Sequence, residues 1–453
     1  MGRITLAQAA SWCGGTIDPK YAQVAFYGAG NDSRSIEQGQ LFVALKGVRD
    51  GHDFIPNALE NGAAAVLCQH CDGDYPAIVV EDTRIALGQI AREERKRIGM
   101  KVVGVTGSVG KSTTKEMIAA VLGSTYKVSK TPENHNNDIG MPMSILSIPE
   151  DTEVAVLEMG MNHFREIAYL TNIALPDLAV IINIGTMHIE HLGSREGILK
   201  AKLEILEGLA SDGTILLNGE DDLLWSVSRR EDIPSVYFGT ANEKCSIRGV
   251  NVAACGAELS FDVAAENEDF HVSLPLEGEH YVLDALAAVS AGLKMGIAPE
   301  KIADALEHFQ NMSGRQEIFE EKGFTIIKDC YNAGPESMAA ALSVLGKKKG
   351  RRIAVLGDML ELGMRAPAEH YRIGRIAAEH ADMVFAYGPN GQRVVSGAVT
   401  GGMEGRKART FEDRGALVTT LKAIAKTGDV LLFKGSHGMH MELALEAFLK
   451  DEA

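Results

Sequence analysis

The sequence feature that most restricts how this chain can fold is a glycine-rich loop between a β-branched segment and a helical one. An apolar run covers residues 102–105, the residues TGSVGKST follow at 106–113, and a helical pattern covers 115–122. A strand, such a loop and a helix gather backbone N–H groups around one point, where the helix dipole also favours negative charge. The pattern therefore predicts a phosphate site in an α/β sheet, with Lys111 as an added positive charge.

The loop departs from the strict nucleotide-binding pattern G-x-x-x-x-G-K-[ST], because Val105 stands where that pattern has glycine. The strand and helix on either side still favour a phosphate site over a chance turn before a lysine. Ser112 would also bind Mg²⁺, as Ser or Thr does at this position of such loops. We expect ATP to bind through a set of residues that comprises Thr106, Gly107, Ser108, Val109, Gly110, Lys111, Ser112 and Thr113.

Two further predicted strands lead to residues that could bind a metal ion. Glu158 follows the apolar run 154–157, and His188 lies beyond the run 178–184. Because parallel sheets present their ligands at the carboxyl ends of strands, a carboxylate there can reach a hard cation beside the phosphates. A lone histidine after a strand is more often structural, but its place near the loop and the carboxylate favours a ligand.

The length of the chain, 453 residues, predicts several domains. Strands alternate with helices throughout, so the expected fold class is α/β. We expect a small α/β domain over 1–98, a central domain with a parallel sheet over 99–311 and a third α/β domain over 312–453. Short alternating runs between 242 and 276 favour antiparallel strands beside the central sheet. A hinge is expected at 311–315.

Charge and composition argue against several classes of partner. The net charge is −16, so the chain lacks the positive charge that drives nucleic-acid binding. Neither a signal-peptide pattern nor an apolar run of the ~18 residues that a membrane span needs is found, and we expect a cytoplasmic protein. Six cysteines are too few for a disulfide scaffold. Cys68 and Cys71 form a lone C-x-x-C, which favours reduced thiols over a metal site.

These motifs resemble those of the Mur ligase family, in which the phosphate loop reads TGxxGK[ST]. The resemblance covers nearly the whole chain and implies an ATP-dependent ligase that joins a carboxylate to an amine through an acyl phosphate. Within the central domain it continues through NHNNDIG at 134–140, EMG at 158–160 with Asn162 and His163, NIGTMH at 183–188 and AKLE at 201–204.

The resemblance implies two Mg²⁺ sites. The family's lysine that matches Lys202 is carbamylated, which turns a cation into a carboxylate-like ligand. Ser112 and Glu158 are expected to bind one Mg²⁺, and His188 with carbamylated Lys202 a second.

The resemblance also implies further contacts with ATP and the acceptor. Asn137 would orient the acceptor or the γ-phosphate. The residues expected to be catalytic are Lys111, Asn137, His188 and Lys202, and those expected to bind ATP from the third domain, which should be Rossmann-like, are Arg315, Asp329 and Asn332.

The outer domains indicate which substrates such a ligase would use. DSR at 32–34 and LFVALKG at 41–47 resemble the UDP-binding domain of members that act on UDP-muramoyl peptides, and imply that UDP is bound by Ser33, Arg34, Lys46 and Gly47. DCYNAGP at 329–335 and VLGDMLELG at 355–363 resemble motifs of the members that add D-alanyl-D-alanine. The expected substrates are UDP-N-acetylmuramoyl-tripeptide and D-Ala-D-Ala, in peptidoglycan precursor synthesis, and the expected state is a monomer.

The sequence departs from the family pattern at four positions. The segment GEHYVLD at 278–284 stands where the family has GxHNxxN, so Tyr281 and Asp284 replace two asparagines that help to hold the nucleotide. Gly334 replaces the second Asn of NANP, and His437 stands where Arg is usual. Drift within the family explains these changes, and an altered acceptor or amine substrate is the alternative.

Two other functions stay open at this stage. A Mur-type ligase for another UDP-muramoyl peptide or a non-wall acceptor would share the central motifs, although VLGDMLELG argues against it. A P-loop NTPase switch would hydrolyse ATP without an amine and would not need the pair His188 and Lys202. A dinucleotide-binding oxidoreductase is disfavoured, because GxGxxG follows no predicted strand.

Overall fold

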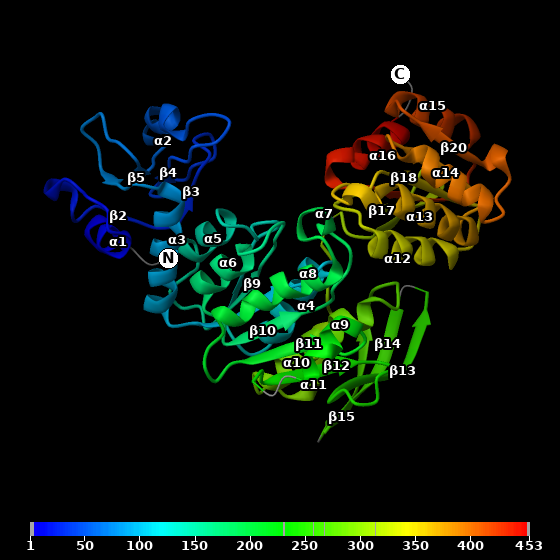
Figure 1. The fold of residues 1–453 in the computed structure, drawn as a ribbon, viewed down its shortest axis with the longest axis horizontal. Coiled ribbons are helices and arrows are strands. Elements are labelled where there is room, and N and C mark those ends of the chain that lie inside the picture. Colours follow the sequence, from blue (N-terminus) through cyan, green and yellow to red (C-terminus); the bar gives the residue numbers. More distant parts are fainter. Residues whose placement is uncertain (1–3, 230–231, 257, 267, 313, 451–453) are drawn as a thin grey trace.

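The computed structural model of the chain describes residues 4–229, 232–256, 258–266, 268–312 and 314–450. In Figure 1 the elements form three groups along the chain, coloured blue, green, and yellow to red. Each group contains a sheet with parallel strands and the helices that cover it, which confirms the predicted α/β class.

The first group is built on a four-stranded sheet, in the order β3-β4-β5-β6, whose neighbouring strands are parallel. β4 and β5 are buried along their whole length, as expected of parallel strands covered on both faces. The elements are β1 (Ile4–Thr5), α1 (Leu6–Cys13), β2 (Ala25–Phe26), β3 (Ala29–Gly30), β4 (Leu41–Val43), α2 (Ile55–Glu60), β5 (Ala65–Cys68), β6 (Ala77–Val79) and α3 (Thr83–Ile98).

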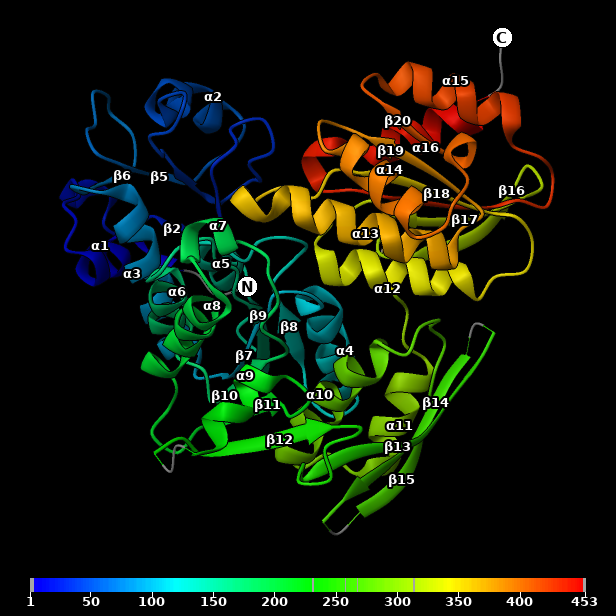
Figure 2. The same cartoon turned by 45° about the vertical axis from the view of Figure 1, so that its right-hand side comes forward.

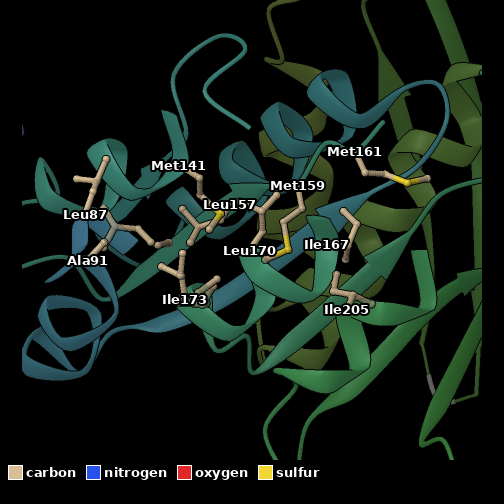
Figure 3. Close-up of a cluster of buried hydrophobic side chains, with 14 of the residues drawn as sticks. Leu87, Ala91, Met141, Leu157, Met159, Met161, Ile167, Leu170, Ile173 and Ile205 are labelled. Atoms are coloured by element: carbon tan, nitrogen blue, oxygen red, sulfur yellow. The ribbon is translucent and has the colours of Figure 1, made fainter. Parts of the chain in front are cut away.

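Helix α3 joins the first group to the central one through a shared core. Leu87 and Ala91 of this helix lie in one buried cluster with Leu157 of the central sheet and Leu170 of a central helix (Figure 3). The helix ends at Gly99, whose φ of 72° is the left-handed conformation that favours glycine. Because the core continues from one group into the other, the two should move together as one body, and the expected boundary between 98 and 99 stays a prediction.

The central group contains a nine-stranded sheet in the order β15-β14-β13-β12-β11-β10-β7-β9-β8. In this order, each strand from β13 onward to β8 runs parallel to the next one. At the other end of the sheet, β14 pairs antiparallel with both β13 and β15. This confirms the antiparallel strands expected between 242 and 276. The strands are β7 (Lys101–Thr106), β8 (Val128–Lys130), β9 (Val154–Glu158), β10 (Leu178–Ile181), β11 (Thr214–Asn218), β12 (Ser235–Gly239), β13 (Ile247–Cys255), β14 (Glu258–Ala265) and β15 (Glu268–Leu274).

Helix α4 of the central group begins earlier than its sequence pattern indicates. It starts at Lys111 instead of 115, because Gly110 with φ 84° turns the chain directly into the helix. The lysine and Ser112 therefore lie in the first helical turn, where free N–H groups point outward. The central helices are α4 (Lys111–Gly123), α5 (Gly140–Leu146), α6 (Glu166–Ala174), α7 (Ile189–Leu192), α8 (Arg195–Lys202), α9 (Asp222–Ser226), α10 (Tyr281–Lys294) and α11 (Pro299–Glu307).

The third group is a doubly wound sheet in the order β16-β17-β21-β18-β19-β20, parallel except for the pair β16 and β17. Successive residues of its strands face two separate cores, one under α12, α13 and α14 and the other under α15 and α16, which is the predicted Rossmann-like architecture. The elements are β16 (Glu317–Glu321), β17 (Phe324–Asp329), α12 (Pro335–Gly346), β18 (Arg352–Gly357), α13 (Ala366–His380), β19 (Met383–Tyr387), α14 (Gly391–Thr400), β20 (Ala408–Phe411), α15 (Arg414–Ile424), β21 (Val430–Lys434) and α16 (Met441–Leu449).

The third group lies close to the central one. In Figure 1 and Figure 2 alike, α7 lies beside elements of the third group, and the loop before α13 contacts it. Of the segment 311–315, in which a hinge is expected, Ser313 lies outside the described residues. In the part of the chain that the structure describes, no helix has both the length and the apolar character needed to cross a bilayer.

A carboxylate is buried where α10 packs against α4. Asp284 of α10 is 6% exposed and accepts a 2.9 Å hydrogen bond from the Thr114 hydroxyl of α4. It also lies against the phosphate loop, since a Cβ atom at Gly110 would lie 2.7 Å from Oδ1 of Asp284. Burial raises the pKa of Asp284 from 3.8 to about 7, although the Thr114 hydrogen bond and the Arg315 charge oppose the rise.

We predict that Asp284→Asn will stabilise the protein in a pH-dependent way. The carboxyl group of Asp284 loses its proton near pH 3.8 in the unfolded chain and near pH 7 in the folded chain. The free energy of unfolding of the wild type therefore decreases as the pH rises from 3.8 to 7, and it stays at the lower value above pH 7. The melting temperature of the variant relative to wild type should therefore be higher at about pH 8 than at about pH 5. Calorimetry at the two pH values measures this, with Asp212→Asn, at an exposed position in the turn before β11, as control. An equal difference at both pH values would contradict the raised pKa.

Candidate active site

A cavity of about 920 Å³ opens beside the phosphate loop, between the central and third groups of elements. Both groups line it, which places most of the predicted site residues around one space. These residues are Ser108, Val109, Gly110, Lys111, Ser112, Thr113, Asn137, Glu158, His188, Arg315, Asp329 and Asn332. Thr106, Gly107 and Lys202 are not part of its lining.

The phosphate loop is held in shape by Asn183, which follows β10. The side-chain oxygen of Asn183 accepts hydrogen bonds of 2.9 Å from the N–H groups of Ser108 and Val109, and its amide donates to the carbonyl of Val109. The hydroxyl of Ser108 in turn accepts from the N–H of Gly185. The strand after the loop thus fixes the loop conformation.

Lys111 is folded back over the loop that precedes it. Its Nζ donates to the carbonyl of Gly107 at 3.0 Å. Burial lowers the pKa of the Lys111 ammonium, the Arg315 charge adds to this effect, and Glu158 opposes it. A buried cation with few partners would be stabilised by the negative charge of a phosphate in the cavity.

Ser112 and Glu158 form an oxygen-rich corner of the cavity. The Ser112 hydroxyl donates to Oε2 of Glu158 at 2.7 Å, and Asn136 donates to Oε1 of Glu158 at 2.8 Å. The side chains of Ser112 and Glu158 are both buried. Two hard oxygen donors in contact fit Mg²⁺. Within the described residues, no three Asp, Glu, His or Cys side chains are grouped to hold a metal, so phosphate oxygens would have to complete this site.

Lys115 and Thr131 support Glu158 from behind. The Lys115 ammonium is fully buried, donates to the carbonyl of Thr131 at 2.7 Å and lies 3.9 Å from Oε2 of Glu158. The hydroxyl of Thr131 accepts from the backbone N–H of Glu158. This cation offsets part of the cost of burying the carboxylate. The sequence motifs assigned no role to Lys115. Its position in the helix that follows the phosphate loop was the one feature that could have indicated a place near the site.

His188 and Lys202 occupy different positions relative to the cavity. His188 lies at its wall, with a left-handed backbone (φ 62°), and its Nδ1 is 2.7 Å from Oε2 of Glu361 in the third group. Lys202 is the last residue of α8 and is buried behind the wall. Among the hydrogen bonds and ion pairs of the described residues, none joins these two side chains directly.

The surroundings of Lys202 favour a neutral amine. Burial lowers its pKa well below the ordinary value, and the nearby Lys111 cation adds to the effect. Glu204, the acidic side chain closest in sequence, instead accepts hydrogen bonds from the backbone N–H groups of Arg165 and Ala168 at the start of α6. Burial thus favours the neutral form of the Lys202 amine over the ammonium.

Asn136 and Asn137 differ in what they contact. Asn137 uses its side-chain oxygen to accept from the N–H groups of Ile139 and Gly140, where α5 begins, while its amide group stays available at the cavity wall. Its neighbour Asn136 is the residue that contacts Glu158. The sequence pattern alone could not separate these two adjacent asparagines.

The third group contributes charged residues at the ends of two neighbouring strands. Asp329 ends β17 and pairs with Lys434, which ends β21 and is buried, at 2.5 Å. The Lys434 ammonium also donates to the carbonyl of Asn332 at 2.9 Å. The sequence motifs assigned no role to Lys434, although an apolar run at 430–433 comes directly before it.

Arg315 connects the third group to the phosphate loop. Its guanidinium lies 4.0 Å from the centre of the Tyr331 ring and donates to the Ser112 hydroxyl at 2.8 Å. A second contact between the groups is made by Glu336, which accepts from the hydroxyl of Thr186 at 3.0 Å. A cation that reaches the loop from the other side of the cavity can neutralise a phosphate bound there.

The residues expected to bind UDP lie in the first group and do not line the large cavity. Arg34 is exposed and forms a two-pronged ion pair with Asp32, at 2.6 Å for the shorter contact. Ser33 is buried, and its carbonyl accepts from the Asn61 amide. Lys46 and Gly47 belong to an exposed loop. Their role in binding UDP stays a prediction.

Comparison with known proteins identifies related sequences along the whole chain. Three family models match it: the Mur ligase family, catalytic domain, over 25–103, the Mur ligase middle domain over 105–292, and the Mur ligase, glutamate ligase domain, over 314–437. The UDP-N-acetylmuramoyl-tripeptide--D-alanyl-D-alanine ligase of Bacillus subtilis (strain 168) is 41% identical over 448 residues, covering 97% of this chain and 96% of the relative. The ligase of the same name from Escherichia coli (strain K12) is 34% identical and covers 98% of both chains.

Solved structures agree with these matches. The fold is similar to that of MurF from Acinetobacter baumannii, with a TM-score of 0.91, 32% identity and full coverage of both chains. It is also similar to that of the MurF ligase from Thermotoga maritima in complex with ADP, with a TM-score of 0.82 and 30% identity over 93% of this chain and 97% of that one. Family models, relatives and structures lead to the same conclusion: this chain belongs to the Mur ligase family.

Proposed function

We propose that this protein is an ATP-dependent ligase that joins D-alanyl-D-alanine to UDP-N-acetylmuramoyl-tripeptide with release of ADP and phosphate. The observation that carries the proposal is the cavity shared by the phosphate loop and the third group, in which Arg315 reaches Ser112. Relatives of this name match nearly the full chain, and one similar structure holds ADP.

The reaction must make a carboxylate reactive toward an amine. At neutral pH the direct reaction would have to expel oxide, whereas transfer of the γ-phosphoryl group of ATP to the carboxylate creates an acyl phosphate with a good leaving group. Lys111 and Arg315 both contact the phosphate loop and would stabilise the negative charge on the transferring oxygens. Mg²⁺, held by Ser112 and Glu158, would supply further positive charge at the same point.

Water must be kept away from the acyl phosphate. The ATP contacts come from two groups of elements, so closure of the third group over the central one would complete the site and exclude water. Arg315 and Glu336 are already in contact with the central group in this structure. This arrangement favours a ligase over an NTPase switch, which needs no second substrate site.

We also propose that Lys202 is carbamylated and, together with His188, forms a second Mg²⁺ site. The burial of the Lys202 amine, which lowers its pKa, supports this assignment. An ammonium would repel the metal, whereas a carbamate offers the oxygen ligands that Mg²⁺ prefers.

Further parts of the proposal concern the first group and the setting of the enzyme. Ser33, Arg34, Lys46 and Gly47 would bind UDP, in domains bounded at 98/99 and 311/312. The protein would act as a cytoplasmic monomer on small-molecule substrates.

The first test measures phosphate release from ATP. We expect steady release only when UDP-N-acetylmuramoyl-tripeptide and D-Ala-D-Ala are both present, because the acyl phosphate needs an amine to turn over. L-Ala-L-Ala serves as the control dipeptide. Equal turnover without either substrate would support an NTPase instead.

The second test concerns Lys202. Lys202→Ala should lower ligation by about 100-fold or more, the scale of a lost electrostatic contact to the transition state. Acetate or formate in solution should partly restore activity, because it can replace the carbamate as an oxygen ligand. Lys200→Ala is the matched control, since Lys200 is exposed on the same helix and should have a mild effect. Unchanged ligation by Lys202→Ala would contradict the carbamate.

The third test addresses the UDP site. Arg34→Ala should raise the KM for the nucleotide peptide about tenfold, as expected for the loss of a charge-assisted contact to a phosphate, and leave the KM for ATP unchanged. Arg92→Ala, which removes an exposed arginine from α3, should change neither value. A rise in the KM for ATP would mean that the first group does not hold the UDP moiety.

A further inference from the structure

The contact between His188 and Glu361 joins two groups of elements at the edge of the cavity. Nδ1 of His188 lies 2.7 Å from Oε2 of Glu361, and the imidazole is largely buried, with 15% of its side chain exposed. Nδ1 is buried and makes no hydrogen bond of good geometry in the part of the chain that the structure describes, so a small rotation of the ring or of the carboxylate would be needed for Nδ1–H to donate to Glu361. Nε2 is then the ring nitrogen left for a ligand. Histidine ligands of metals commonly donate their second N–H to a carboxylate, which fixes the ring orientation.

The loop that carries Glu361 is anchored to the third group. The backbone N–H of Met359 donates to Nε2 of His370 at 2.9 Å, and that of Leu360 donates to the Ser436 hydroxyl at 2.9 Å. Ser436 in turn donates to the carbonyl of Ala333, beside the cavity. The backbone just before Glu361 is therefore anchored, while the side chain of Glu361 itself is half exposed.

Both residues of the pair have an unusual backbone conformation. His188 and Glu361 each have φ 62°, in the left-handed region that non-glycine residues rarely adopt. Such conformations are energetically unfavourable and are found preferentially at functional sites. Gly363 brings the loop against α7, since a Cβ there would lie 3.0 Å from the side chain of Glu190. Two unfavourable backbone conformations and close packing thus occur together at the contact between His188 and Glu361.

We propose that Glu361 is a positioning residue that orients His188 for its ligand role, so that docking of the third group completes the metal site of the central group. This inference rests on the proposed function, because it takes His188 as a Mg²⁺ ligand. Glu361 would not touch ATP or the peptide. It would act only through the imidazole, and closure and metal binding would be coupled.

The test measures metal binding by the full-length protein with a non-hydrolysable ATP analogue, using Mn²⁺ and electron paramagnetic resonance. Glu361→Ala should weaken Mn²⁺ binding by about 10- to 100-fold, the range seen when a carboxylate partner of a metal-bound histidine is removed. Glu361→Gln should bind nearly as wild type, because its amide oxygen can still accept from Nδ1–H. In ligation assays, Glu361→Ala should lower kcat more than it raises the KM for ATP.

The matched control is Lys347→Gln. Lys347 pairs with Glu279 at 2.8 Å, so it also joins the third and central groups, but both side chains are exposed and neither lines the cavity. Its loss should leave Mn²⁺ binding unchanged. Wild-type Mn²⁺ affinity in Glu361→Ala, or an equal loss in Lys347→Gln, would overturn the proposal.

The titration contains neither the nucleotide peptide nor the dipeptide, so its result does not depend on the identity of the acceptor. A wild-type protein that ligates the two substrates, combined with unchanged Mn²⁺ binding by Glu361→Ala, would refute the inference alone. A protein whose Mn²⁺ binding is weakened by Glu361→Ala, but whose wild type does not ligate the two substrates, would refute the proposed acceptor alone.

Discussion

The active site depends on the parallel alignment of β7 with its two neighbours in the central sheet. Val105 pairs with Glu158 of β9 and Thr106 with Ile181 of β10, so all three strands end at one edge. The phosphate loop, the carboxylate and the segment that leads to His188 follow from that edge. A shift in this register would move the carboxylate away from Ser112 and turn its side chain to the other face of the sheet.

Burial gives the charged groups of this edge their chemical character. Glu158 is tolerated in the interior because Ser112, Asn136 and Lys115 surround it. Among the described residues no carboxylate pairs with Lys202, and burial lowers the pKa of its amine. The same physical cost, the removal of charge from water, thus requires partners around the carboxylate at one position and favours a neutral amine at the other.

Much of this organisation was predictable from the sequence. The strands and helices of all three groups repeat short apolar patterns that depend on neighbouring residues, and the antiparallel segment at 242–276 was visible in the same way. The start of α4 was misplaced, because the left-handed turn at Gly110 is a backbone property that apolar periodicity does not report. Cavity residues such as Glu158 and Arg315 were found through motifs, and the structure brings them together.

The sequence by itself determined the α/β class, the phosphate loop and the residue types that could bind phosphate and metal, because these depend on local patterns and on the chemistry of single side chains. Only the tertiary structure decided that Asn136 contacts Glu158 while its neighbour accepts hydrogen bonds from the backbone at the start of α5, and that Lys434 pairs with Asp329. The same holds for the contact of Glu361 with His188. The physical reason is that such contacts join distant parts of the chain, and strand register and the docking of separate sheets determine which side chains meet.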